Sequence, residues 1–359
     1  QDFKEAGIHV PILVGGAALS KRFTETKIAA QYDGPVIYSK DAMQGLDHAN
    51  RLMAVHERES FIQELQQSRE KRLLADEKRA ARPQVTVMEK PVRTVRDAPV
   101  YIPKDLVQHI KRNYSVAHLH PYVNMRTLIG HHLGLKGNVE KLLAEKDERA
   151  TELHELVNDY LRSDLLTPSG MYQFFPAQAD GDDVVIYSPE DRNTEIERFH
   201  FPRQKEAPFL CLADFLKTVE SGEMDYVALM VVTAGHGVKN VADELKKDGK
   251  FLESHALLAT ALELAEGFAE RIHQEIRDVW GFPDATDFTM RERFAAKYQG
   301  QRFSFGYPAC PNLEDQEKLF KLLKPEQIGV QLTEGYMMEP EASVSAIVFA
   351  HPDARYFNV

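Results

Sequence analysis

From about residue 98 onward, apolar and polar positions alternate between a helical and a strand-like period. Apolar residues recur every three to four positions in five segments, which predicts helices at 103–112, 138–163, 213–220, 250–279 and 314–323. Short apolar or alternating runs predict strands at about 183–187, 195–201, 225–233 and 342–350. These elements come in clusters and not in strict alternation. The pattern therefore indicates an α+β fold, with a mostly antiparallel sheet and helices packed around it.

The first 53 residues have a different, βαβα pattern. The run VPILVGG precedes a helical stretch from about Lys21 to Gln31, and a second strand near Val36–Tyr38 precedes a helix from Asp41. Two βα units make only a corner of a doubly wound sheet, because a parallel sheet must be covered on both faces. We expect a truncated α/β, Rossmann-like segment whose earlier strands lie upstream.

Gly15 and Gly16 stand at the carboxyl end of the first of these strands. Without side chains, their backbone N–H groups could approach the phosphate of a nucleotide-like tail. A tight turn from strand to helix explains the two glycines equally well. The pattern alone leaves both interpretations open.

Residues 54–97 form a charged connection between the two regions. The stretch 54–82 is rich in helix formers and free of Gly and Pro, and it is followed by an extended segment punctuated by Pro83, Pro91 and Pro99. A coiled coil is the alternative, but the apolar positions do not keep a heptad over several turns. We expect a solvated linker helix, and hence three regions at 1–53, 54–97 and 98–359.

Composition and charge argue against some classes of partner. The chain has 359 residues and a net charge of −11, which argues against nonspecific binding to nucleic acid. No apolar run approaches the length of a membrane span, and the first residues lack the features of a signal peptide, so we expect a cytoplasmic protein without a membrane partner. The two cysteines provide neither a disulfide framework nor a CxxC pair.

Two short histidine clusters raise the question of a metal site. They are HLH at 118–120 and HH at 131–132. Adjacent helical residues point about 100° apart, and no nearby Asp or Glu has ligand spacing. We interpret them as surface histidines and expect no metal.

The segment QRFSFGYPACPNLEDQ, from Gln301 to Gln316, combines one arginine with several aromatic residues and two prolines. Arg302 offers a planar fork that suits a carboxylate, and the rings of Phe303, Phe305 and Tyr307 suit a flat ring or a sulfonium cation. The alternative is a loop whose aromatic residues fill the core.

Several motifs carry a resemblance that covers essentially the whole chain. The run RFSFGYPACPNLEDQ and the segment GVQLTEGYMMEPEASVSAIVFAHPDARYF at 329–357 resemble the S-adenosylmethionine-binding activation domain of cobalamin-dependent methionine synthase. The segments YVNMRTLIGHHLG, CLADF, DYVALMVVTAG and LAEGFAERIHQEIRDVWGF follow the same order as in that family. VPILVGGAALSKRFTETKIA and GPVIYSKDA resemble the last two βα units of its cobalamin-binding domain.

The resemblance implies roles for individual residues in S-adenosylmethionine binding. It assigns the ligand carboxylate to Arg302, assisted by the Ser304 backbone and the Tyr307 ring, and it adds contacts from Tyr356 and Phe357. Glu266 matches an acidic position near the pocket. Two positions depart from the family: Asn124 replaces an acidic residue that holds the ligand's amino group, and Ala296 replaces a second glutamate. An amide oxygen accepts a hydrogen bond but provides no charge, so we expect weaker or differently supported binding.

The resemblance assigns packing against the cobalamin nucleotide tail to Gly15, Gly16 and Ala42. The family's D-x-H-x-x-G motif, whose histidine ligates cobalt, is absent from this sequence. We therefore expect an incomplete cobalamin site.

The function implied is reductive reactivation within methionine biosynthesis. A flavodoxin-like or other reductase supplies an electron, and bound S-adenosylmethionine donates its methyl group to cob(I)alamin held by the cobalamin-binding domain of the full-length enzyme. The domain's contribution is positioning, so we expect no catalytic acid, base or nucleophile, and we expect the fragment to be inactive alone. Two alternatives remain: a regulatory docking module that does not bind S-adenosylmethionine, and an independent S-adenosylmethionine-dependent methyltransferase.

Overall fold

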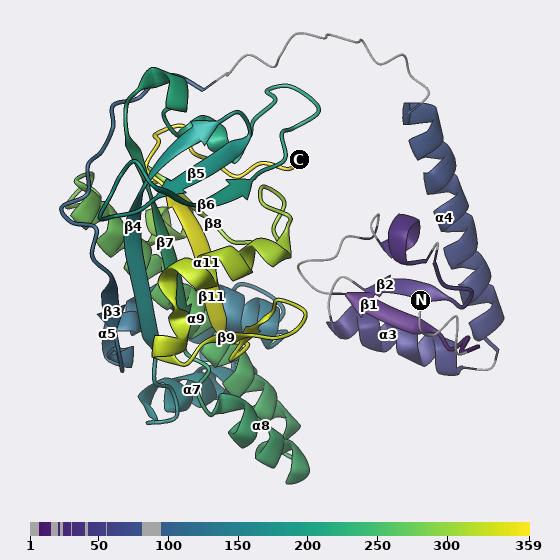
Figure 1. The fold of residues 1–359 in the computed structure, drawn as a ribbon. Coiled ribbons are helices and arrows are strands. Elements are labelled where there is room, and N and C mark those ends of the chain that lie inside the picture. The colour runs from purple at the N-terminus through teal and green to yellow at the C-terminus, as the bar shows by residue number, and fades with distance from the viewer. Residues whose placement is uncertain are drawn as a thin grey trace. The chain divides into compact units, whose positions relative to one another are not determined.

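The structure is a computed structural model that describes residues 7–15, 21, 24–29, 31–39, 42–54, 56–80 and 95–359. The chain divides into two compact units, Gln1–Lys90 and Pro91–Val359, each described here by itself. Figure 1 shows strands β1 and β2 in the first unit and the large sheet in the second. The domain boundaries expected from the sequence, at 53 and 97, stay predictions.

The described part of the first unit is built on two parallel strands, β1 (Ile12–Gly15) and β2 (Val36–Ser39). Two helices follow, α3 (Ala42–Met53) and α4 (Arg58–Ala80). Ile37, Leu52 and Phe61 form a small buried cluster, so the beginning of α4 packs onto this unit and is not fully solvated. Within the helical stretch expected at 21–31, the described residues include Lys21, which is helical, and a short π-helix, η1 (Thr24–Ile28); residues 22, 23 and 30 lie outside the described residues.

The second unit contains a seven-stranded antiparallel sheet within the described residues 95–359. The strand order is β6-β5-β4-β7-β11-β8, with β3 also paired to β4. The bounds are β3 His109–Lys111, β4 Ser169–Asp180, β5 Asp183–Tyr187, β6 Glu195–His200, β7 Asp225–Thr233, β8 Gln301–Phe303 and β11 Ser343–Phe349. A small hairpin adds β9 (Gln331–Leu332) and β10 (Met338–Glu339). The expected α+β class with a mostly antiparallel sheet is confirmed.

Both faces of this sheet are buried. Because successive side chains of a strand point to opposite faces, alternate residues belong to two different hydrophobic clusters. Tyr172 and Phe174 of β4 belong to one hydrophobic cluster, whereas Met171 and Phe175 belong to the other. Strand β7 alternates in the same way along DYVALMVVT, and eight of its nine residues are buried. A run that is apolar throughout is typical of such a central strand.

The long helix α9 (Phe251–Trp280) packs against β7, β11 and β4 and contributes more residues to the first cluster than any other element. The same cluster takes residues from α5 (Val116–Leu119), α7 (Glu148–Arg162) and α8 (Val238–Lys247). The opposite face is covered by α11 (Gln316–Leu323) and by short 3₁₀ turns. These turns and the remaining helical segments are η2 His120–Tyr122, η3 Arg126–His132, α6 Val139–Ala144, η4 Leu212–Phe215, η5 Val219–Ser221, α10 Met290–Phe294, η6 Leu313–Asp315 and η7 Pro325–Ile328.

Two of the expected helices are wrong. The segment 103–112 is largely irregular and ends in β3, because His109–Lys111 pair with β4 and the His109 ring stacks on Tyr172 at 4.5 Å between centroids. The segment 213–220 forms only the short turns η4 and η5. The helix expected at 138–163 is present as α6 and α7, with a break between them.

Candidate functional site

A cavity of about 180 Å³ lies where α9 meets β8 and the C-terminal segment. Its walls come from regions far apart in the sequence, which the sheet brings together: η2, α9, the stretch from α10 to β8, and the last residues of the chain. The lining residues are Tyr122, Glu263, Glu266, Gly267, Glu270, Arg293, Phe294, Ala296, Tyr298, Gln301, Arg302 and Tyr356.

Helix α9 contributes one acidic face to this cavity. Glu263, Glu266 and Glu270 are spaced by three and four residues, so they lie on the same side of the helix. Glu263 and Glu270 are buried, whereas the Glu266 side chain is 54% exposed. Desolvation raises the pKa of Glu266 above its ordinary value, and Arg302 partly opposes this. The cavity thus has a strongly acidic wall that favours a cationic ligand.

Arg302 of β8 faces this acidic wall. Its Nη1 donates to Glu270 Oε2 at 2.5 Å, and its Nη2 lies 3.9 Å from Glu266 Oε2. Burial works against the charge, but Glu270 and its neighbours hold the pKa of Arg302 above its ordinary value. A guanidinium of this kind is a permanent cation with planar donors, the arrangement that recognises a carboxylate.

Buried polar side chains support Arg302 from behind. The Tyr298 hydroxyl donates to Glu270 Oε2 at 3.1 Å, and burial raises the pKa of Tyr298 to about 12, which keeps the hydroxyl protonated. The Nδ1 atom of His273 lies 3.4 Å from Arg302 Nη1. Burial, with the charges of nearby arginines, lowers the pKa of His273 well below its ordinary value, so this ring is neutral.

A second buried network lies beside the first. Arg277 forms a bidentate pair with Asp284, at 2.8 and 2.7 Å, and Arg293 donates to the same carboxylate at 2.6 Å. The Arg277 guanidinium also lies over the Tyr298 ring, 4.0 Å from its centroid. The segment that leads into β8 is therefore fixed to α9 by charge as well as by packing.

The residues after the HPD motif divide between cavity and core. The Tyr356 ring lies 5.1 Å from that of Phe303, and its hydroxyl donates to the Arg302 carbonyl oxygen at 2.7 Å. Phe357 does not line the cavity. It packs against Phe215, at 6.4 Å between ring centroids, on the other face of the sheet.

The GYPACP turn is organised by backbone contacts. The Ser304 carbonyl oxygen accepts hydrogen bonds from the Cys310 thiol at 2.8 Å and from the Tyr307 amide at 3.4 Å. The Tyr307 side chain is 44% exposed, and burial of its hydroxyl together with the nearby Glu266 charge raises the pKa of Tyr307. Neither Ser304 nor Tyr307 lines the cavity, but Tyr307 lies at its acidic edge.

The two positions that depart from the family pattern lie in different places. Asn124 lines a separate depression, and its Oδ1 accepts the Thr127 amide at the start of the π-helix η3. Ala296 lines the cavity and has a positive φ of 50°. Of the residues expected to bind the ligand, the cavity thus unites Arg302, Tyr356 and Glu266.

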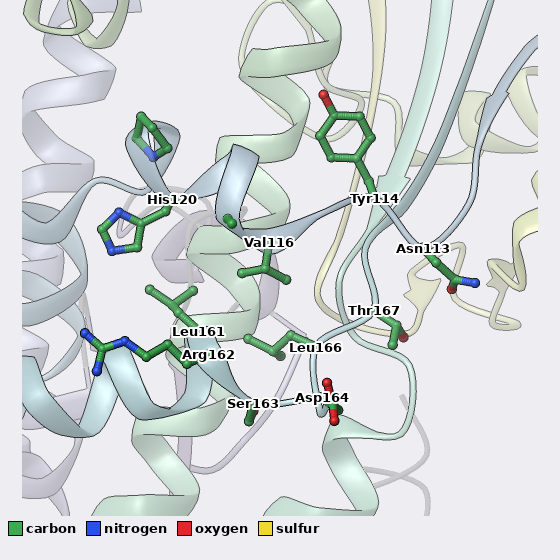
Figure 2. Close-up of a pocket in the computed structure, with 12 residues that line it drawn as sticks. Asn113, Tyr114, Val116, His120, Leu161, Arg162, Ser163, Asp164, Leu166 and Thr167 are labelled. Carbon is green, nitrogen blue, oxygen red and sulfur yellow. The ribbon is translucent and has the colours of Figure 1, made fainter.

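A wider depression, of about 610 Å³, lies elsewhere, between the end of α7 and the start of α5. Figure 2 shows Val116, Leu161 and Leu166 at its centre, with the Tyr114 ring and the Arg162 guanidinium extending away from them. No opposed charged groups converge there, so its size alone does not make it a binding site.

In the first unit, the absence of a side chain at Gly15 allows strands β1 and β2 to lie close together. A Cβ atom at Gly15 would lie 2.2 Å from the Ser39 carbonyl oxygen, so the protein's own backbone fills the space that the missing side chain leaves. Gly16 lies outside the described residues, and Ala42 is the first residue of α3. The surroundings of Gly15 do not by themselves provide a fit for cobalamin.

The described residues contain neither a candidate metal-binding cluster nor a candidate membrane-spanning helix. Within them, His, Cys, Asp and Glu side chains form no group of three or more that could hold a metal ion. In the same part of the chain, every helix is too short or too polar to cross a membrane. In the HH pair, His132 Nε2 lies 3.1 Å from Glu263 Oε1, an ordinary side-chain partner.

Sequence reasoning missed the residues that hold Arg302 in place. Glu270 and Tyr298 carry this role, and neither was expected. One signal was present: three glutamates at helical spacing within the largely apolar stretch 256–270 of the helix. Such charges are almost never buried unless they are paired.

Comparisons with known proteins agree with this architecture. Residues 115–359 match the family model described as "Vitamin B12 dependent methionine synthase, activation domain". Methionine synthase of Mycobacterium tuberculosis (strain ATCC 25618 / H37Rv) is 33% identical over 385 residues, covering 97% of this chain and 32% of that protein. Methionine synthase of Mycobacterium leprae (strain TN) is 30% identical over 392 residues, with the same coverage. The chain thus spans about a third of the length of these relatives.

A solved structure extends the comparison to three dimensions. A crystal structure of the MetH reactivation domain bound to AdoHcy superposes with a TM-score of 0.68 at 31% identity, covering 73% of this chain and 83% of that one. Together with the family match over residues 115–359, this shows that the chain belongs to the family of vitamin B12-dependent methionine synthase activation domains.

Proposed function

We propose that residues 98–359 bind S-adenosylmethionine in the α9–β8 cavity and hold its methyl group for the reductive reactivation of a methionine synthase. The observation that carries the proposal is Arg302, a permanent cation fixed at the base of a cavity whose opposite wall is acidic. The solved relative, with AdoHcy bound, supports a ligand of the same adenosyl amino acid class.

The charges of the cavity match those of the ligand. S-Adenosylmethionine carries a carboxylate, an ammonium and a sulfonium, hence a net positive charge. Arg302 pairs with the carboxylate, while Glu266 is the half-exposed carboxylate nearest to it and suits the ammonium. The exposed ring of Tyr356, and that of Tyr307 at the acidic edge, suit the adenine or the sulfonium. Ser304 and Phe357 act through the turn and the core that place these rings, and Asn124 is assigned no direct contact.

The proposed function requires two partners: a cobalamin-binding domain and an electron donor. Because the relatives are far longer than this chain, we infer that cobalamin is held by a cobalamin-binding domain and that a flavodoxin-like or other reductase supplies the electron. Cobalamin supplies the nucleophile that accepts the methyl group. This chain's own residues bind and orient the methyl donor, which needs no acid or base. We infer a cytoplasmic role in methionine biosynthesis.

The two alternatives differ in what supports them. An independent methyltransferase of the usual kind places a glycine-rich loop in a parallel sheet, whereas the large sheet here is antiparallel. A docking module without a ligand gains some support from Asn124, which is engaged at η3, and from Ala296, which brings no charge to the cavity.

Isothermal titration calorimetry of S-adenosylmethionine into the chain tests the proposal. We expect saturable one-to-one binding that is lost in Arg302→Ala and strongly weakened in Arg302→Lys, which keeps the charge but loses the planar fork. Arg149→Ala is the matched control, because Arg149 pairs with Glu152 on the surface of α7. A folded wild-type chain that binds no S-adenosylmethionine would leave the docking module as the function.

A further inference from the structure

We propose that Glu270 is a positioning residue for ligand recognition: it holds one edge of the Arg302 guanidinium so that the other edge receives the ligand carboxylate. This inference rests on the proposed function and names a residue that acts on the ligand only through Arg302. Glu270 lies on α9 and Arg302 on β8, and their ion pair joins the two walls of the cavity.

The two edges of the guanidinium have different surroundings. Three groups meet Nη1: Glu270 Oε2 at 2.5 Å, and the Tyr298 hydroxyl and His273 Nδ1, each at 3.4 Å. Toward Nη2 the nearest anionic partner is Glu266, at 3.9 Å, on a half-exposed side chain. One edge is therefore occupied by protein acceptors, and the other lies on the side of the cavity where a ligand can enter.

The groups behind Arg302 cannot easily move away. The side chains of Glu270 and Arg302 are only 8% and 17% exposed, and His273 is fully buried. Glu270 Oε2 also accepts from the Tyr298 hydroxyl at 3.1 Å, which fixes the carboxylate in turn. Glu270 is thus held through Oε2, and it holds Arg302 in one orientation. An arginine that is already ordered loses less side-chain entropy when the ligand binds.

The state of His273 fits the same arrangement. A neutral imidazole can accept from Nη1, whereas an imidazolium would repel the guanidinium. Burial and the charges of Arg277, Arg302 and Arg293 keep His273 neutral. Glu270 is consequently the anionic group that contacts Nη1 directly.

Positioning and simple electrostatics predict opposite effects for Glu270→Gln. A buried carboxylate behind Arg302 weakens the attraction of the arginine for a ligand carboxylate, so electrostatics alone predicts tighter binding of the carboxylate when Glu270 is neutralised. Positioning predicts weaker binding, because glutamine is a poorer acceptor and Arg302 loses its fixed orientation.

The test is calorimetry of wild type and Glu270→Gln with three ligands. S-Adenosylmethionine and S-adenosylhomocysteine both carry the carboxylate, and they differ in the sulfonium charge. Decarboxylated S-adenosylmethionine keeps the sulfonium and the amine but lacks the carboxylate. We expect Glu270→Gln to weaken the first two ligands equally, by about tenfold, and the third by less than about twofold.

Other outcomes overturn the inference. Equal weakening of all three ligands would mean a general structural role, and tighter binding of S-adenosylmethionine would mean that charge and not position governs the site. Absence of any binding to the folded wild type would refute the proposed function itself, and this inference with it.

Two further variants keep the test decisive if Glu270→Gln does not fold. Tyr298→Phe keeps the ring under Arg277 but removes the hydrogen bond to Glu270, so we expect the same ligand pattern with a several-fold effect. Glu275→Gln is the control. Glu275 lies on α9, as Glu270 does, but it pairs with Lys111 of β3 and does not line the cavity, so its neutralisation should leave all three affinities unchanged.

Discussion

The Tyr356 hydroxyl donates a hydrogen bond to the Arg302 carbonyl oxygen, 2.7 Å away, across 54 residues of sequence. Strand β8 is an edge strand of the sheet, and its pairing with β11 is short, from Gln301 to Phe303. Tyr356 thus ties the C-terminal segment to the strand that carries the cationic side chain of the cavity. The contact therefore joins the HPDARYF segment to the strand that precedes the GYPACP turn.

Removing this hydroxyl tests its contribution to stability. Tyr356→Phe keeps the ring contact with Phe303 but leaves the Arg302 carbonyl oxygen without this donor. We expect a loss of about 0.5–1.5 kcal/mol in the free energy of unfolding, measured by urea denaturation. Tyr307→Phe is the control, because Tyr307 is about half exposed at the turn. An equal effect of both substitutions would show that the Tyr356 hydroxyl has no special role.

The buried His273 predicts a dependence of stability on pH. Its pKa is depressed in the folded state, so between the folded and the ordinary value of about 6.5 the unfolded chain binds more protons. The stabilisation is therefore fully present above pH ~6.5 and is lost as the pH falls below it. Between pH 8 and pH 4, the free energy of unfolding should fall less steeply with pH in His273→Gln than in the wild type. The two slopes should differ by the equivalent of up to one bound proton. His131→Gln, on the surface, is the control, and an unchanged slope in His273→Gln would contradict the prediction.

Asp284 predicts a second loss of stability at lower pH. Burial opposes its charge, but Arg277 and Arg293 hold the pKa of Asp284 below its ordinary value. Such a carboxylate stabilises the fold above pH ~4 and loses this effect as the pH falls further. Asp284→Asn leaves two buried guanidinium groups without their anion, since Arg277 is fully buried and Arg293 is 5% exposed.

We expect Asp284→Asn to lower the free energy of unfolding by about 3–5 kcal/mol at pH 7. Chemical denaturation followed by circular dichroism measures this loss. Asp243→Asn is the control, because Asp243 is half exposed and pairs with Lys246 on the surface of α8 at 3.7 Å. A loss below about 1 kcal/mol in Asp284→Asn would show that the network is not a stabilising element.

The first unit is expected to open more easily than the second. Its described sheet has only two strands, β1 and β2, whereas β7 is paired on both sides and lies between two hydrophobic clusters. Two-stranded sheets are marginally stable on their own. Hydrogen exchange with mass spectrometry should show amides of Val36–Ser39 exchanging well before those of Asp225–Thr233. Equal protection of both strands would disprove this.

Sequence patterns predicted those elements whose own residues dominate their environment. Strand β7 is apolar from Tyr226 to Val232, and α9 repeats apolar residues over eight turns, so both were identified. Strand β4 was missed because Pro176 interrupts it and because Gln173 and Gln178 lie within it. Their amides donate to the carbonyl oxygens of Leu106 and Glu223, contacts that no local pattern reveals. The helix predicted at 103–112 was wrong for a similar reason, since pairing with β4 overrides the helical period of this segment.

The site divides in the same way. Arg302 and Tyr356 stand in motifs that resemblance identifies, and the structure brings them together. The pairing of Arg302 with Glu270 depends on how α9 packs against β8. The spacing of residues along the sequence does not predict this packing. Asn124 shows the reverse case: the motif position was identified, but its side chain is used to cap η3.

Ala296 offers a gain-of-function test of the acidic wall. It lines the cavity in a left-handed conformation, and glutamate has the same Cβ constraint as alanine, so Ala296→Glu adds a charge with little added backbone strain. If the ligand is bound through its cationic groups, the added carboxylate should tighten S-adenosylmethionine by about 1 kcal/mol, several-fold in Kd, and S-adenosylhomocysteine by less, because it lacks the sulfonium. The difference should shrink in high salt. Ala296→Gln separates charge from shape: if calorimetry gives equal changes for Gln and Glu, the wall selects its ligand by shape, and the acidic face of α9 is not what recognises the cation.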